Sequence, residues 1–147
     1  MGYFMRYVAT DSKPVTLDQI EAALKKASPD YSIRKFSETR GELRLGNDIY
    51  GTVEINRAGD QLFASEIQGL VEEVEEAGGI GKKTVLRALD DASSIIAVQV
   101  LWGPRKTEET LAKLDSLWNW LLANHEGLVQ ADGEGYYQNR KLILKTG

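Results

Sequence analysis

A strand followed by a proline and then an amphipathic helix occurs twice in this sequence, and this repeat is the strongest constraint on the fold. Tyr3–Ala9 and Ile95–Trp102 have the aromatic and β-branched composition of strands. Pro14 and Pro104, which follow these two strands, are 90 residues apart. The pattern predicts two related modules, although few residues are identical between them.

Each predicted helix begins at a threonine, and the two threonines, Thr16 and Thr107, are 91 residues apart. Thr16 and Gln19 have the spacing of a capping box, in which each side chain bonds the other residue's backbone N–H. Thr107 is the N-cap candidate of a longer helix that ends near Asn124, before Gly127. Both helices carry an apolar stripe, which indicates packing against a sheet.

Antiparallel strands are predicted after each helix. The first helix precedes Tyr31–Phe36, Gly41–Leu45 and a strand from about Ile49 to Asn56. The second precedes a hairpin of Leu128–Tyr137 and Lys141–Lys145. Strands in meanders combined with amphipathic helices favour an α+β two-layer sandwich, with a mainly antiparallel sheet and helices on one face. The element order of the first two-thirds is ferredoxin-like.

The region between the modules is predicted to be helical. Asp60 is an N-cap candidate for a helix that Gly78-Gly79 terminates, and a shorter helix runs from about Lys82 to Ala92. Length fits one domain, residues 1–147, with modules at about 3–58 and 94–146 and a helical insert at about 60–92.

The residue composition excludes several kinds of catalytic and metal-binding sites. The chain has no cysteine and one histidine, His125, which excludes thiolate catalysis and Cys- or His-rich metal sites. The glycine-rich segment 78–84 lacks the spacing of a phosphate-binding loop, because Glu76 and Lys83 occupy positions that need Gly and Ser or Thr. We therefore expect no cofactor and no metal.

The charge and hydropathy of the sequence limit the kinds of binding partner that we expect. The net charge is −4, and residues 60–77 contain six acidic and no basic side chains, so we expect no nucleic-acid binding. The longest apolar run, Ile95–Trp102, is far shorter than the roughly 20 residues of a membrane span. The first residues lack the apolar region of a secretory signal. A soluble cytoplasmic protein is the expectation.

Two groups of polar and aromatic residues are candidates for ligand binding. In the first, strand alternation places Tyr50, Glu54 and Asn56 on one face, opposite an apolar face. The second is the segment 132–137, whose glycines fit either a ligand site or a bulged hairpin. Its candidate residues are Asp132, Glu134, Tyr136 and Tyr137. A small-ligand site between the modules, or a carboxylate-based hydrolase, are the alternative functions that these residues suggest.

Trp120 is the residue that favours our first hypothesis. A rotation of 100° per residue puts it about 135° from the centre of the apolar stripe, beside Lys113 and Ser116. A large aromatic on a polar helix face marks either an interface or a site covered by another segment, such as a loop or the C-terminal hairpin. With few catalytic residue types present, the sequence favours a non-enzymatic protein-interaction module, of the immunity type or as a homodimer.

Overall fold

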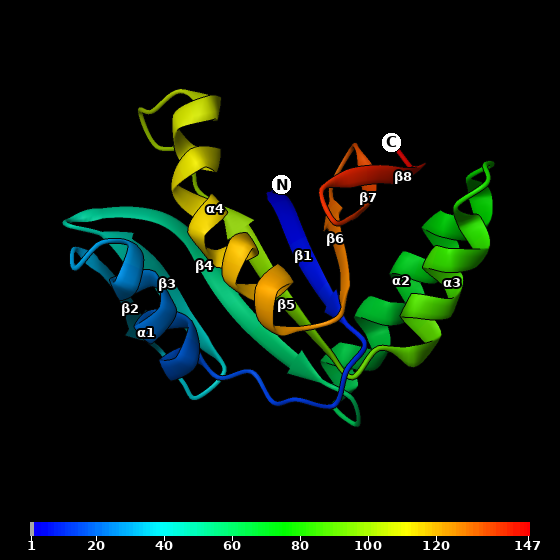
Figure 1. Ribbon diagram of the computed structural model, residues 1–147, viewed down its shortest axis with the longest axis horizontal. Coiled ribbons are helices and arrows are strands. Elements are labelled where there is room, and N and C mark those ends of the chain that lie inside the picture. Colours follow the sequence, from blue (N-terminus) through cyan, green and yellow to red (C-terminus); the bar gives the residue numbers. More distant parts are fainter. Residues whose placement is uncertain (1) are drawn as a thin grey trace.

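The computed structural model describes residues 2–147, and these residues contain one continuous antiparallel sheet of eight strands (Figure 1). β1 (Tyr3–Ala9) is central and pairs with β5 (Ser94–Val100) and β6 (Gly127–Ala131). The sheet order is β2-β3-β4-β5-β1-β6-β7-β8. The other strands are β2 (Tyr31–Lys35), β3 (Arg40–Leu45), β4 (Asp48–Arg57), β7 (Gly135–Gln138) and β8 (Lys141–Lys145). The predicted α+β class is confirmed, and both modules share one sheet.

The two module helices, α1 (Leu17–Ala27) and α4 (Thr107–Asn124), cover one face of the sheet, as predicted (Figure 1). Their apolar stripes pack on inward-facing strand residues such as Ile96 and Val98. This face carries the larger core, with Tyr7, Val53, Leu114 and Leu121 among its members.

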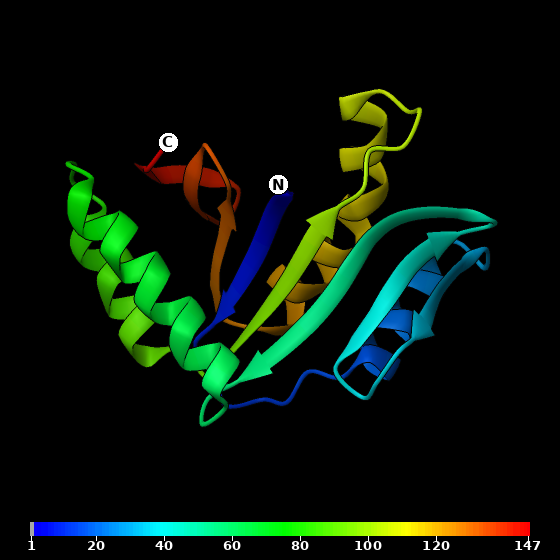
Figure 2. The ribbon, with the colours of Figure 1, turned by 180° about the vertical axis from the view of Figure 1, so that it is seen from behind.

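The helical insert forms α2 (Gln61–Glu76) and α3 (Lys82–Asp91), and it packs against the opposite face (Figure 2). Val8, Ile95 and Ala97 point to this side, alternating with residues of the first core. β5 is therefore apolar on both faces because helices cover both. Within residues 2–147, no helix combines the length and apolar content needed to cross a bilayer.

Helix starts are stabilised unequally. In α1 the predicted capping box is present: Thr16 Oγ1 accepts from Gln19 N, and Gln19 Oε1 accepts from Thr16 N, both at 3.1 Å. Asp60 is the N-cap residue of α2, but its side chain makes no capping bond. Thr107 is the first residue of α4 and not its N-cap, which is Lys106.

The C-terminal region differs from the predicted two-stranded hairpin. Residues 128–137 are not one strand, because the chain turns at 132–134 and separates β6 from β7. Gly133 and Gly135 have φ angles of 75° and 141°, which side chains other than glycine rarely adopt. A Cβ at Gly135 would overlap the carbonyl oxygen of Leu144. The second module is therefore β5-α4-β6-β7-β8, the same order as β1-α1-β2-β3-β4.

Candidate functional site

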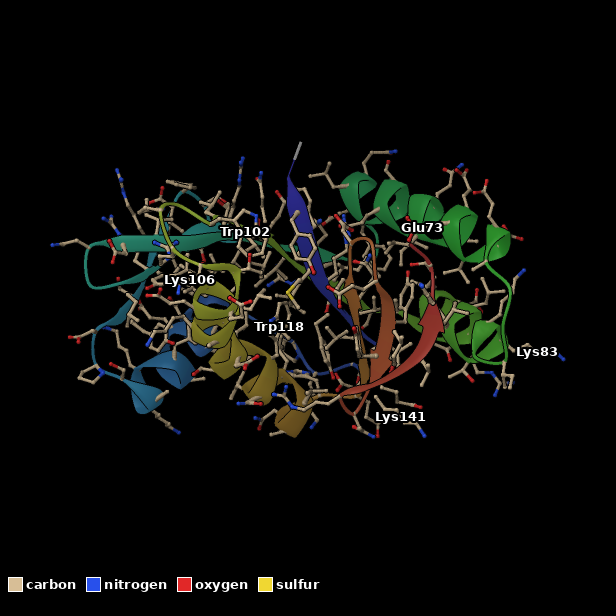
Figure 3. All side chains as sticks on the ribbon, turned by 90° about the horizontal axis from the view of Figure 1, so that it is seen from above. Glu73, Lys83, Trp102, Lys106, Trp118 and Lys141 are labelled. Atoms are coloured by element: carbon tan, nitrogen blue, oxygen red, sulfur yellow. The ribbon has the colours of Figure 1, made fainter. Side chains whose placement is uncertain are left out.

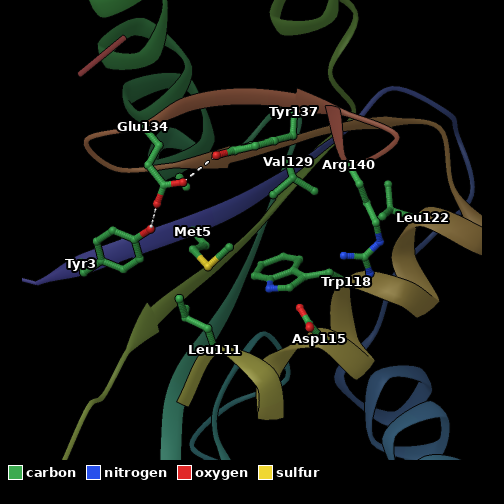
Figure 4. A pocket seen from close by; sticks show the side chains of 11 residues that line it. Tyr3, Met5, Leu111, Asp115, Trp118, Leu122, Val129, Glu134, Tyr137 and Arg140 are labelled. Atoms are coloured by element: carbon green, nitrogen blue, oxygen red, sulfur yellow. Dashed lines mark hydrogen bonds between the residues drawn. The ribbon is translucent and has the colours of Figure 1, made fainter. Parts of the chain in front are cut away.

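A pocket of roughly 230 Å³ lies between α4 and the C-terminal strands (Figure 4). Helix α4 contributes residues spaced four, three and four apart, which places them on one side of the helix. We call this cavity the α4–hairpin pocket. The residues that line it are Tyr3, Met5, Leu111, Asp115, Trp118, Leu122, Val129, Ala131, Glu134, Tyr137 and Arg140. Its floor is apolar, and its charged groups lie at the rim.

Trp118 is the most informative residue of this pocket. It belongs to the same core cluster as Leu114, Leu117 and Leu121 of α4, and only 4% of its surface is exposed. In the view from above, it lies between α4 and strands β1 and β6 (Figure 3). Its Nε1 atom is buried and has no hydrogen-bond partner within residues 2–147. A buried donor without a partner costs about 1–3 kcal/mol, which an acceptor entering the pocket would offset.

Glu134 is fixed at one end of the pocket by two tyrosines (Figure 4). Tyr3 donates its hydroxyl to Oε2 at 2.7 Å, and Tyr137 donates to Oε1 at 2.6 Å. Burial and the Glu134 hydrogen bond raise the pKa of Tyr3. The Glu134 hydrogen bond is also the main cause of the raised pKa of Tyr137. Both hydroxyls therefore remain protonated donors, and both carboxylate oxygens are engaged.

Arg140 and Asp115 lie at the other end, beside Trp118 (Figure 4). Arg140 occupies the two-residue turn between β7 and β8, where Asn139 has φ 48° and Arg140 has φ 69°. Two successive positive φ angles define a type I′ hairpin turn, whose second position favours glycine. Both Arg140 and Asp115 are exposed, and neither forms an ion pair within residues 2–147.

The opposite face of the sheet carries a hydrogen-bonded network centred on Arg6 of β1. Its Nε donates to Glu66 of α2 at 2.7 Å, and its Nη1 donates to Gln130 at 2.7 Å and to Asp132 at 3.0 Å. Asn56 donates to Glu66 at 3.0 Å and to Glu54 at 3.2 Å. We call Arg6, Glu54, Asn56, Glu66, Gln130 and Asp132 the Arg6 network.

The structure divides the predicted ligand residues between the two faces. Glu54, Asn56 and Asp132 meet in the Arg6 network, whereas Glu134 and Tyr137 line the α4–hairpin pocket. Tyr136 is fully buried in the core beneath α2 and α3. Gly133 and Gly135 do provide the special torsions of a tight connection, and the same connection positions Glu134.

The prediction that Tyr50, Glu54 and Asn56 share one face of the sheet is wrong for Tyr50. The pairing of β3 and β4 shifts at Leu43/Arg44, where Tyr50 has no partner opposite it. This β-bulge turns Tyr50 onto the α1/α4 face, where it is 4% exposed and packs under the guanidinium of Arg105. Strict alternation across residues 50–56 therefore does not apply.

Trp120 is half-buried in a groove between α1 and α4. Its ring packs edge-on against the His125 ring, with 5.7 Å between the two ring centroids. Helix α1 and the loop before it, which includes Lys13 and Pro14, lie beside Trp120, so a loop adjoins it as considered from sequence, whereas the C-terminal hairpin does not line this groove. Lys113 and Ser116 are also partly buried, and the Lys113 carbonyl accepts the Tyr31 hydroxyl at 2.7 Å. We call this region the Trp120 groove; it is lined by Lys13, Pro14, Gln19, Ala22, Ala23, Lys26, Trp120, Asn124 and His125.

Sequence reasoning missed Trp118 and Arg140 as site residues. Trp118 belongs to the apolar stripe of α4 and is buried, but helical periodicity does not show whether its indole N–H has a partner. Arg140 had a usable signal, because Asn139-Arg140 is a two-residue loop that begins with Asn, the residue favoured in type I′ turns. Comparisons of the chain with protein-family models, with curated proteins and with solved structures found no match.

Proposed function

We propose that this protein is a non-enzymatic binding protein that takes a small organic molecule into the α4–hairpin pocket. The observation that carries the proposal is Trp118, whose side chain lines the pocket and whose buried Nε1 is a donor without a partner within the described residues. The pocket adds an apolar floor and a few charged groups at its rim, the usual composition of ligand sites. Of the functions considered from sequence, the geometry of this pocket favours ligand binding. The pocket includes residues of the C-terminal hairpin but not the sheet face that carries Glu54.

The volume of the pocket limits the size of the ligand. Sites for drug-sized molecules occupy about 300–1,000 Å³. At roughly 230 Å³, the α4–hairpin pocket suits a molecule with one ring or a short branched chain. Met5, Leu111 and Val129 supply apolar contacts for such a body.

The indole N–H of Trp118 provides a direct test. The chain has three tryptophans, so ¹⁵N–¹H spectra contain three indole signals, which Trp102→Phe and Trp120→Phe variants assign. A panel of single-ring carboxylates, amines, alcohols and amino acids is titrated at millimolar concentration. We expect at least one compound to shift the Trp118 signal saturably, because its acceptor bonds to the indole N–H.

A matched pair of substitutions controls this experiment. Leu111→Phe fills the pocket from α4, whereas Leu62→Phe makes the same change at an exposed site on α2. The shift should vanish in the first variant and persist in the second, with circular dichroism confirming that both are folded. Val129→Phe fills the pocket from β6 if Leu111→Phe does not fold. No shift with any compound, or an equal shift in the filled variants, would refute the proposal.

A second candidate function is binding of a protein partner through the Trp120 groove. The favouring observation is that Trp120 stays partly exposed there, flanked by Lys13 and Lys26. Tryptophan is enriched among residues that dominate binding energy, and the lysines suit an acidic partner surface. Trp120→Ala should then abolish association with a second copy or partner in native mass spectrometry, while Trp120→Phe retains part of it. Equal association of Trp120→Ala and the wild type would contradict this role.

A further inference from the structure

We infer that the ligand of the α4–hairpin pocket is a free α-amino acid with an aromatic or branched apolar side chain. This inference rests on the proposed function and adds the chemical class of the ligand. It comes from one end of the pocket, where Trp118, with its buried N–H, lies beside the exposed side chains of Arg140 and Asp115 (Figure 4).

Two of these groups can donate hydrogen bonds to a ligand. Trp118 Nε1 is buried and unpartnered, and Arg140 forms no ion pair within the described chain. A guanidinium and an N–H at the same end of a pocket are complementary to a carboxylate, which accepts several charge-assisted hydrogen bonds. The position of Arg140 supports a specific role, since its backbone adopts a left-handed conformation that most residues avoid.

Asp115 makes a simple carboxylic acid a poor fit. It precedes Trp118 by three residues on α4 and lines the same end of the pocket. Its carboxylate would repel a ligand that carries only negative charge, but it would pair with an ammonium group. A carboxylate and an ammonium separated by one carbon, as in an α-amino acid, satisfy Arg140, Trp118 and Asp115 together.

The remaining part of the pocket would receive the ligand side chain. Met5, Leu111 and Val129 form apolar walls between this end and Glu134 (Figure 4). Glu134 closes the far end, and its two oxygens already accept the hydroxyls of Tyr3 and Tyr137. The ammonium is therefore assigned to Asp115, because Asp115 lies at the same end of the pocket as Arg140 (Figure 4), whereas both oxygens of Glu134 already accept hydrogen bonds at the far end.

Four probes with related structures separate these contributions. L-Phenylalanine carries all three features, 3-phenylpropionate lacks the ammonium, 2-phenylethylamine lacks the carboxylate, and L-alanine lacks the ring. We expect L-phenylalanine to bind about ten-fold or more tightly than each of the others, as measured by the Trp118 indole shift and by calorimetry.

Two substitutions at exposed positions test the assignments. Arg140→Gln should weaken L-phenylalanine binding about ten-fold and leave 2-phenylethylamine unchanged, because only the former has a carboxylate. Asp115→Asn should weaken L-phenylalanine similarly, while 3-phenylpropionate binds as well as before or better. Both side chains are exposed, so thermal unfolding should confirm near wild-type stability.

The outcomes distinguish this inference from the proposed function. If 3-phenylpropionate or 2-phenylethylamine binds as tightly as L-phenylalanine, or if Asp115→Asn has no effect, the amino-acid assignment is overturned while ligand binding stands. The same holds if other compounds shift the Trp118 signal and L-phenylalanine does not. If no compound in the full panel shifts it, the proposed function fails as well.

Discussion

The two faces of strand β1 show opposite ways of placing polar groups near a protein core. On the face toward α2, Arg6 is largely buried and donates to three side chains from different elements. On the face toward α4, Trp118 is more deeply buried, its N–H has no partner within the described residues, and its side chain lines a pocket. A network with satisfied donors stabilises the fold, whereas an unsatisfied donor beside a pocket is available to a ligand.

The largest expected effect is on the network face. Arg6→Ala removes the cation that joins Glu66 and Asp132, and it leaves their partly buried carboxylates without a counter-charge. We expect a loss of about 3 kcal/mol in the free energy of unfolding, measured by urea denaturation. Arg140→Ala is the control on the pocket face and should change stability by less than about 0.5 kcal/mol. Equal losses in both variants would remove the distinction between the faces.

Gly135→Ala should be the next most damaging change, because β7 carries residues of both faces. The φ angle of 141° is unfavourable for alanine, and the new Cβ would overlap the Leu144 carbonyl oxygen. We expect a loss of about 2 kcal/mol and a changed Trp118 indole signal, since Glu134 and Tyr137 flank this glycine.

Gly133→Ala provides the comparison, because its φ of 75° is also positive but no atom lies within 4 Å of its added Cβ. It should cost less and leave the pocket signal in place. A larger loss at Gly133 than at Gly135 would show that torsion alone, without the overlap, controls this connection.

The comparison of the two faces also shows what sequence patterns can and cannot reveal. The order of elements as far as α4 and the α1 capping box depend on neighbours a few residues apart, and both were predicted. Arg6 lies inside an otherwise strand-like segment, and its partners Glu66 and Asp132 are 60 and 126 residues away. Tyr50 was misassigned because a bulge depends on pairing with another strand. Local patterns thus predict elements, whereas the polar sites depend on the register of distant segments.

Outside the pocket, Asp11 makes a pH-dependent contribution to the stability of the fold. Burial acts to raise its pKa, but the hydrogen bond with His125 Nδ1 at 3.0 Å and those from the N–H groups of Glu126 and Lys13 outweigh this. The pKa of Asp11 is therefore lower in the folded protein than its ordinary value of 3.8. Its stabilisation is present above that value and is lost as the pH falls through the lower, folded-state pKa.

Asp11→Asn tests this contribution. We expect the variant to be about 1 kcal/mol less stable than the wild type near neutral pH, with the difference shrinking as the pH falls from about 5 to about 2. Urea denaturation at several pH values measures it. A difference that is independent of pH would mean that the carboxylate charge of Asp11 contributes nothing.

The smallest expected effect concerns Tyr136, whose hydroxyl is also buried without a partner within residues 2–147. It differs from Trp118 because it is fully buried among apolar residues such as Val8 and Leu144, and it does not line the α4–hairpin pocket. Burial is the main cause of its raised pKa, so the hydroxyl stays neutral. Tyr136→Phe removes the unpaired group and should be neutral or stabilising by up to about 1 kcal/mol in urea denaturation.

Ligand binding should further distinguish the unpaired Trp118 N–H from the unpaired Tyr136 hydroxyl. Tyr136→Phe should leave the response of the Trp118 indole signal to small molecules unchanged, because its hydroxyl faces the other side of the sheet. Trp118→Phe retains an aromatic ring but removes the N–H, and it should weaken binding of a ligand that supplies an acceptor, as measured by calorimetry. If both variants weakened binding equally, an unpaired buried donor would not by itself mark the binding face. If only Trp118→Phe did so, the adjoining pocket is what distinguishes a binding group from a tolerated cost of folding.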